Sequence, residues 1–184
     1  MDRVEQGIDP SSEEVPMHVS DALAKRLVAY RRDFHRYAEV GWTEFRTASL
    51  VARRLTELSE ALDGTLEVRV GRDVIKPEAR MGVPPNEDLE RHWQRAVAQG
   101  GDPTFLQAMK GGFTGVVGIL GNGDGPTVGL RFDIDALPLR ESQSPEHRSA
   151  REGFASINNG PLDPAMHACG HDGHTAIGLG VAEV

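Results

Sequence analysis

The apolar positions of the chain recur at helical spacing in two segments near its N-terminus. In the first segment they fall at i, i+4, i+7 and i+11, one face of an amphipathic helix formed by Leu23, Leu27, Tyr30 and Phe34. Ser20 and Asp21 precede this face and are candidate caps. After an interruption at Gly41, a second helix is predicted from about Thr43, with an apolar stripe of Ala48, Val51, Leu55, Leu58 and Leu62. Residues 1–20 show no such periodicity and are predicted to form a loose arm.

A strand pattern follows the second helix. Leu66, Val68 and Val70 alternate with polar residues, which predicts a short strand. The signal weakens in residues 71–112, where prolines indicate a loop. Within this segment two short helices are predicted, the first of them on the surface, at 86–99 and 103–109.

Beyond Gly112 the pattern becomes clear again. Residues 113–120 and 127–133 are rich in strand-forming side chains and flank a dense turn signal of glycine, asparagine, aspartate and proline. We therefore expect these two runs to pair as a hairpin, with the first run buried. Helices and strands mixed in this order favour an α/β fold over an all-helical or all-β one.

Composition and charge narrow the classes of partner. The 184 residues are 39% hydrophobic and 26% charged, which is typical of a globular protein rather than a disordered one. Lys plus Arg is 20 against 28 Asp plus Glu, a net charge of -8, which argues against nucleic acid and against an anionic membrane surface. No apolar run approaches the roughly 20 residues of a membrane span. The single cysteine excludes an intrachain disulfide, and the polar N-terminus is unlike a signal peptide, so a cytoplasmic protein is expected.

Two acidic residues, Asp133 and Asp135, stand at the end of the second strand of the expected hairpin. Ligands of open α/β sheets gather at the carboxyl ends of strands. Acids at i and i+2 of a strand point to one face and repel each other unless a cation, a proton or a histidine lies between them. The alternative is a solvated strand end, and the pair alone favours that interpretation.

Residues 166–175 carry the densest chemistry in the chain. Three histidines, one cysteine and one aspartate, all side chains that bind transition metals, fall within eight positions. Cys169 and His171 are two residues apart, a spacing that suits a loop rather than one helix face, and a helix is predicted to start at about Thr175. A polar loop with hydrogen-bonded histidines and a buried cysteine is the alternative, but the density of ligand types favours a metal site. A thiolate ligand fits zinc and carboxylate ligands fit manganese, so the identity of the metal stays open.

The remaining histidines and acids have simpler interpretations. His35 is assigned to a solvated helix face among arginines, and Glu39 and Glu44 flank Trp42, which is interpreted as an aromatic anchor between helices. The lone histidines are assigned to the surface, namely His18, His92 and His147. No GxGxxG, Walker, GxSxG or CxxC pattern occurs, which argues against dinucleotide, P-loop, serine-hydrolase and zinc-ribbon sites.

Three segments together resemble the signatures of the M20 metallopeptidase family, in its amidohydrolase branch. Residues 166–176 resemble the metal-binding signature, residues 130–137 the second signature, and residues 31–47 the N-terminal one. They occur in the expected order, which is more specific than any one of them. Further segments resemble the part of this branch that acts on p-aminobenzoyl-glutamate, namely residues 80–82, 111–115 and 153–156.

The resemblance implies the α/β fold of a zinc-peptidase-like catalytic domain, a mixed sheet flanked by helices. Residues 21–184 would form its N-terminal part, with a family-specific insertion at about 71–112. The branch's catalytic glutamate pair, its further histidine ligands and its lid domain lie C-terminal to the metal-binding signature. We therefore expect the 184 residues to be an N-terminal fragment that is inactive alone.

For the site, the resemblance implies that Cys169 and His171 are metal ligands, with Cys169 shared by two divalent ions, Mn or Zn. Asp135 would support the site by orienting a ligand or the metal-bound water. The implied activity is hydrolysis of the amide bond of p-aminobenzoyl-glutamate or a related small N-acyl amino acid, and the implied partner is a second hydrolase subunit. Hippurate-like and auxin-conjugate-like substrates are alternatives, as is a non-catalytic metal-binding or partner subunit.

Overall fold

The computed structural model describes residues 19–121, 123 and 125–184. The arm expected over residues 1–20 therefore lies outside the described residues except for its last two. Helices and strands alternate irregularly along the chain: α1 (Asp21–Arg36), α2 (Phe45–Ala61), β1 (Leu66–Val70), α3 (Asn86–Ala98), α4 (Pro103–Met109), β2 (Val116–Leu120), α5 (Arg148–Arg151) and α6 (His171–Glu183). Two short 3-10 turns follow β1, at Gly71–Asp73 and Pro77–Ala79. In the described part of the chain, no helix is both long and apolar enough to span a bilayer.

The predicted helical pattern before residue 110 is confirmed. The α1 helix begins after Ser20, whose Oγ accepts the backbone N–H of Leu23 at 3.2 Å, so one unpaired donor of the first turn is satisfied. The predicted helices at 86–99 and 103–109 correspond to α3 and α4. Although α3 is largely polar, it buries one face formed by Leu89, His92 and Ala96.

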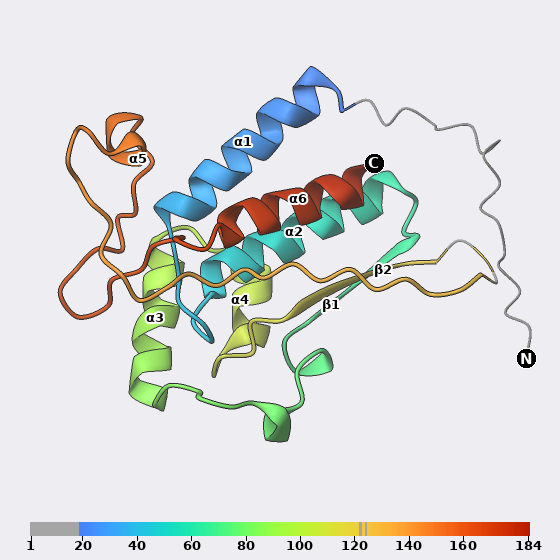
Figure 1. Cartoon of the computed structure of the whole chain (residues 1–184). Helices are drawn as coiled ribbons and strands as arrows, with labels where there is room; N and C mark the ends of the chain where they lie inside the picture. Colours follow the sequence, from blue (N-terminus) through green and yellow to red (C-terminus); the bar gives the residue numbers. More distant parts are fainter. Residues whose placement is uncertain (1–18, 122, 124) are drawn as a thin grey trace, which may run out of the picture.

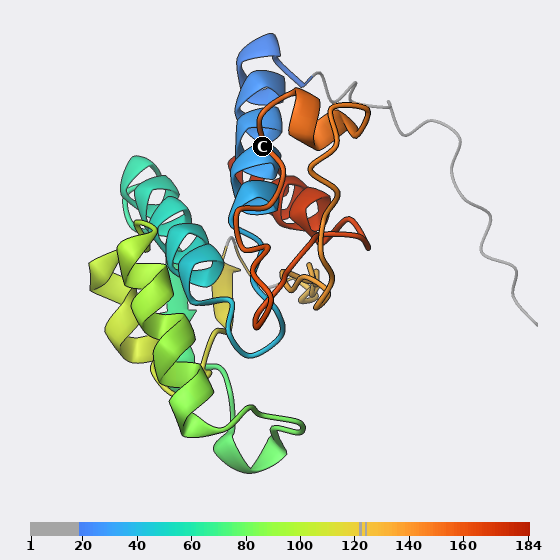
Figure 2. The same ribbon diagram turned by 90° about the vertical axis from the view of Figure 1, so that its left-hand side faces the viewer.

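Two apolar clusters hold these helices together. One lies between α2, α3 and α4, where small residues of α2 allow close approach; it consists of Phe45, Ala48, Ala52, Leu89, Ala96, Leu106 and Met109. The other joins α1, α2, β1 and α6 and consists of Phe34, Leu55, Leu58, Leu66 and Leu179. Figures 1 and 2 show α6 lying beside both α1 and α2, so the last helix completes the core begun by the first two.

The sheet differs from the prediction. β2 pairs antiparallel with β1, in the register Leu66↔Leu120 to Val70↔Val116, and not with residues 127–133. The hairpin prediction is therefore wrong, and β2 is mostly exposed rather than buried. The local turn signal was outweighed by the apolar side chains of β1, which pack β1 and its partner β2 onto α2. Residues 127–133 have no strand assignment, and Val128 and Leu130 are 79% and 65% exposed.

Two isolated backbone bridges position the segment that follows. Val40 pairs in parallel with Ala136, and Leu137 pairs antiparallel with Met166. The segment around Asp135 is thus held between the α1–α2 connection and the residues just before α6. The α6 helix begins at His171, four residues earlier than predicted, directly after Gly170 in the left-handed conformation (φ +83°), which glycine adopts without strain.

Candidate metal centre

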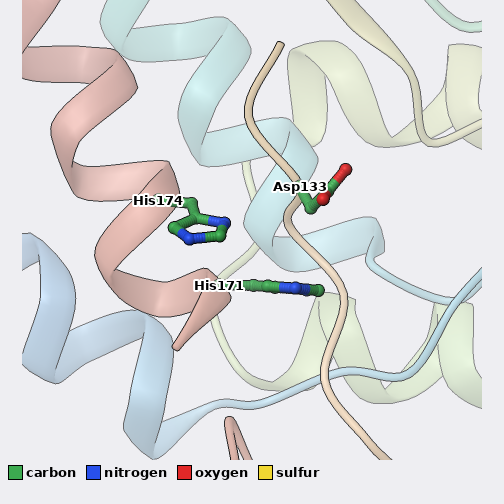
Figure 3. A group of neighbouring side chains, drawn as sticks. All are labelled: Asp133, His171 and His174. Atoms are coloured by element: carbon green, nitrogen blue, oxygen red, sulfur yellow. The ribbon is translucent and has the colours of Figure 1, made fainter. Parts of the chain in front are cut away.

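Three potential ligands converge at the N-terminus of α6. One ligand atom from each of Asp133, His171 and His174 lies within 4.8 Å of the other two. The two histidines are one turn apart on one face of α6, and their rings stack with centroids 5.1 Å apart (Figure 3). Asp133 approaches from the neighbouring extended segment, where it also pairs with the exposed Arg131 at 2.7 Å. A carboxylate and two imidazoles are a donor set that fits zinc or manganese.

The orientation of His171 is fixed by its second ring nitrogen. Nδ1 lies 2.9 Å from the backbone oxygen of Asp135 and 3.0 Å from its Oδ1. Both partners are acceptors, so Nδ1 carries the proton and Nε2 keeps a free lone pair. This is the arrangement by which a carboxylate commonly orients a metal-ligating histidine.

Cys169 does not belong to this group of three. It lies in the bend two residues before α6, and it is an exposed free cysteine. The structure thus brings together His171 and Asp135 of the predicted site and adds Asp133 and His174. The sequence pattern did contain a signal for both additions, because Asp133 belongs to the acidic pair and His174 to the histidine-rich run.

Behind His171, a buried network fixes the start of α6. His35 Nδ1 lies 2.9 Å from Asp172 Oδ2, and its Nε2 lies 2.9 Å from Glu141 Oε1. Burial acts to lower the pKa of His35, but the hydrogen bonds to these two carboxylates outweigh it and raise that pKa. His35 is buried, so its assignment to a solvated face is wrong. The sequence pattern did not reveal this burial because both partners lie more than 100 residues away in sequence.

Other residues interpreted as surface or anchor positions are buried too. Glu39 is fully buried and accepts the backbone N–H groups of Arg46 and Thr47 at 3.0 and 2.8 Å. Glu44 is also buried and accepts the hydroxyl of Thr114 at 2.7 Å. Burial raises the pKa of Glu44 to about 7, with smaller contributions from the nearby charges of Glu39 and Asp135.

Two of the histidines are uncharged at neutral pH because they are buried. His167, within the histidine-rich run, is 5% exposed, and neither ring nitrogen has a hydrogen-bond partner among the described residues. Burial lowers its pKa to about 4. His92 is likewise buried, contrary to its surface assignment, and burial lowers its pKa to about 4 as well. His147 is partly exposed, and His18 lies outside the described residues.

Comparison with known proteins places this geometry in a family. Residues 129–184, which contain all the residues of the candidate metal centre, match the model of peptidase family M20/M25/M40. The chain is also 50% identical, over 163 residues and 88% of its length, to one subunit of p-aminobenzoyl-glutamate hydrolase from Escherichia coli. Residues 129–184 are therefore similar to the M20 peptidase family.

Two further relatives extend this likeness. It is 48% identical over 88% of its length to an indole-3-acetyl-aspartic acid hydrolase from Enterobacter agglomerans. Its fold matches a crystal structure of aminobenzoyl-glutamate utilization protein from Klebsiella pneumoniae with a TM-score of 0.64 and 41% identity, over 88% of this chain and 32% of that one. The chain spans about a third of the length of these relatives, 35% for both hydrolases. Its mixed helix and strand fold is thus shared with about a third of that solved structure.

Proposed function

We propose that this chain supplies metal-holding residues for hydrolysis of the amide bond of a small N-acyl amino acid. The observation that carries the proposal is the convergence of Asp133, His171 and His174 inside the segment that matches the M20 family. A divalent ion bound there would lower the pKa of a water molecule and polarise the amide carbonyl. The proposed ion is zinc or manganese, and two ions per site are proposed for the whole protein.

In this proposal the residues have different roles. His171 binds the ion through Nε2, and Asp135 holds the ring by accepting the Nδ1 proton. Asp133 and His174 are candidate ligands because they already lie beside His171. Cys169 stays a proposed ligand on the strength of the motif alone. The proton transfer to the leaving amine is assigned to a glutamate outside these residues.

We further propose p-aminobenzoyl-glutamate as the substrate. Support comes from the 50% identity to a relative named as a hydrolase of this compound and from the solved relative named for its utilization. The 48% identity to an indole-3-acetyl-aspartic acid hydrolase supports an auxin conjugate as the second candidate. In both compounds an aromatic acyl group is linked by an amide to an acidic amino acid, so the substrate class is the same. The Escherichia coli relative is named as one subunit of its hydrolase, which supports a different, second subunit in the role of partner.

A graft tests the proposal. The chain would replace the matching 163-residue part of the Escherichia coli relative, and the hybrid would be assayed with divalent metal in the presence of the other hydrolase subunit. Metal-dependent release of glutamate from p-aminobenzoyl-glutamate is expected, with loss in His171→Ala and retention in the control variant Lys25→Ala, at an exposed position of α1. Much faster cleavage of hippurate or of indole-3-acetyl-aspartate would contradict the substrate. A folded hybrid that binds metal but cleaves none of the three would favour a non-catalytic metal-binding subunit.

A further inference from the structure

A second polar site lies apart from the candidate metal centre, in a cavity of about 110 Å³. The cavity opens between α3 and the loop that precedes α6. Its walls are apolar over Val40, Pro138, Leu162, Pro164 and Ala165. The polar side chains that line it are His92 and Arg95 of α3 and Asp163 of the loop. Apolar walls with a few polar groups are typical of a small-molecule site.

Arg95 carries donors without acceptors. Nε and Nη2 of Arg95, which form one side of the guanidinium fork, are buried and have no hydrogen-bond partner among the described residues. The same holds for Nδ1 of His92, a residue only 6% exposed. Burial keeps His92 neutral by lowering its pKa to about 4, and its Nε2 lies 3.6 Å from Oδ1 of Asp163, so this ring adds no charge to the cavity. Buried groups of this kind are costly unless something satisfies them.

The carboxylates near Arg95 are already engaged by other donors. The carboxylate of Asp163 accepts hydrogen bonds from Nε and Nη2 of Arg91 at 3.0 and 2.9 Å. Glu39 accepts two backbone N–H groups at the start of α2. Arg95 interacts with both charges only at a distance, and burial lowers its pKa. Its donor pair is therefore directed to an acceptor that the described residues do not supply.

We propose that this cavity binds a short monocarboxylate of two to about four carbons. Its two oxygens would accept the Nε and Nη2 hydrogens of Arg95 as a bidentate pair, and its carbon chain would lie against the apolar walls. The size follows from the volume, since a dry cavity of about 150 Å³ accommodates benzene and this one is smaller. The inference is independent of the proposed hydrolysis, because none of the metal-centre residues lines the cavity.

The test is an NMR titration of the full chain with sodium acetate, propionate and butyrate, against sodium chloride at matched ionic strength. The Arg95 Nε–H resonance is expected to shift saturably with each carboxylate and not with chloride. Arg95→Gln should weaken binding at least about tenfold, as expected for loss of a charge-assisted pair. Arg95→Lys should also weaken it, because a lysine lacks the fork. The matched control is Arg53→Gln on the exposed face of α2, which should leave binding unchanged.

Three results would overturn the proposal. Equal shifts with chloride or inorganic phosphate would indicate an unselective response to anions, and binding unchanged in Arg95→Gln would remove Arg95 from the site. The third result comes from the unmodified chain, whose affinities for carboxylates of different size can be compared even if the variants fail to fold. Affinity should rise from acetate to butyrate and vanish for adamantane-1-carboxylate, which is too large for the cavity. Equal affinity for the bulky acid would place binding on the open surface.

Discussion

His171 has its two ring nitrogens in different surroundings, and this asymmetry defines the candidate centre. Nδ1 faces two oxygens of Asp135, whereas Nε2 is left for a ligand. One ligand atom of Asp133 and one of His174 lie within 4.8 Å of a ring nitrogen of His171. One short segment, residues 133–135, thus supplies both a candidate ligand and the residue that orients a ligand.

Asp135→Ala tests this positioning role. The variant loses the carboxylate acceptor of His171 Nδ1 while the backbone acceptor remains, so metal affinity should fall about 10–100-fold. Isothermal titration with Zn²⁺ measures the change, and circular dichroism checks that the fold is retained. Unchanged affinity in a folded variant would show that the backbone carbonyl alone orients the ring.

Glu44 gives a prediction on pH. Its pKa is raised by burial from 4.5 to about 7, so the folded chain holds this proton more tightly than the unfolded chain does. Stability from this group is therefore present below about pH 4.5 and is lost as pH rises through 7, by roughly 3 kcal/mol. Glu44→Gln keeps a neutral side chain at all pH values and should remove this loss. Urea unfolding of both proteins at several pH values measures it, and parallel curves would contradict the raised pKa.

Among the elements, the connection from β1 to its 3-10 turn depends on one glycine. Gly71 has φ +66°, and a Cβ there would lie 2.4 Å from the backbone oxygen of Ala108 in α4. The position is strained for any other residue both by conformation and by contact. The close approach of β1 and α4 therefore requires a residue without a side chain.

Gly71→Ala should consequently destabilise the fold by more than about 3 kcal/mol, since backbone must move. Gly64 provides the matched control: its φ is +80°, but nothing lies within 4 Å of the Cβ position. Gly64→Ala should cost only about 1 kcal/mol, the conformational part alone. Thermal unfolding of the two variants separates the conformational cost from the cost of the contact with Ala108. Equal losses of stability in both variants would show that this contact is relieved without cost.

The sequence predicts those helices and strands whose pattern depends on neighbouring residues alone. The spacing of Leu23 to Phe34 and the alternation of Leu66 to Val70 identified α1 and β1, because these patterns depend on one element alone. The partner of β2 was missed because β1 lies about 50 residues earlier, and a nearby turn signal pointed elsewhere. His35 was missed for the same reason, since its burial depends on Asp172 and Glu141 from distant segments. The candidate metal centre was predicted in part, since His171 and Asp135 were named, because its potential ligands cluster in sequence.

For the whole molecule, the bridges Val40↔Ala136 and Leu137↔Met166 explain how distant segments reach one site. They connect the first two helices to the segment of Asp133 and Asp135, and that segment to α6. The candidate carboxylate cavity borders the same bridges, through Val40 and Pro138, while its donors come from α3. The fold therefore presents two chemically distinct sites from one framework, one of them in the segment that matches the M20 family.

We expect the start of α6 to hold a divalent metal through His171, and Co²⁺ titration of the 184-residue chain followed by absorption spectroscopy is the direct test. Saturable binding should be lost in His171→Ala and retained in Lys25→Ala, at an exposed position of α1. A thiolate-to-cobalt charge-transfer band that disappears in Cys169→Ala would add Cys169 to the ligands, whereas saturable binding without this band would leave Asp133 and His174 as its companions. Binding that persists unchanged in folded His171→Ala would contradict the claim.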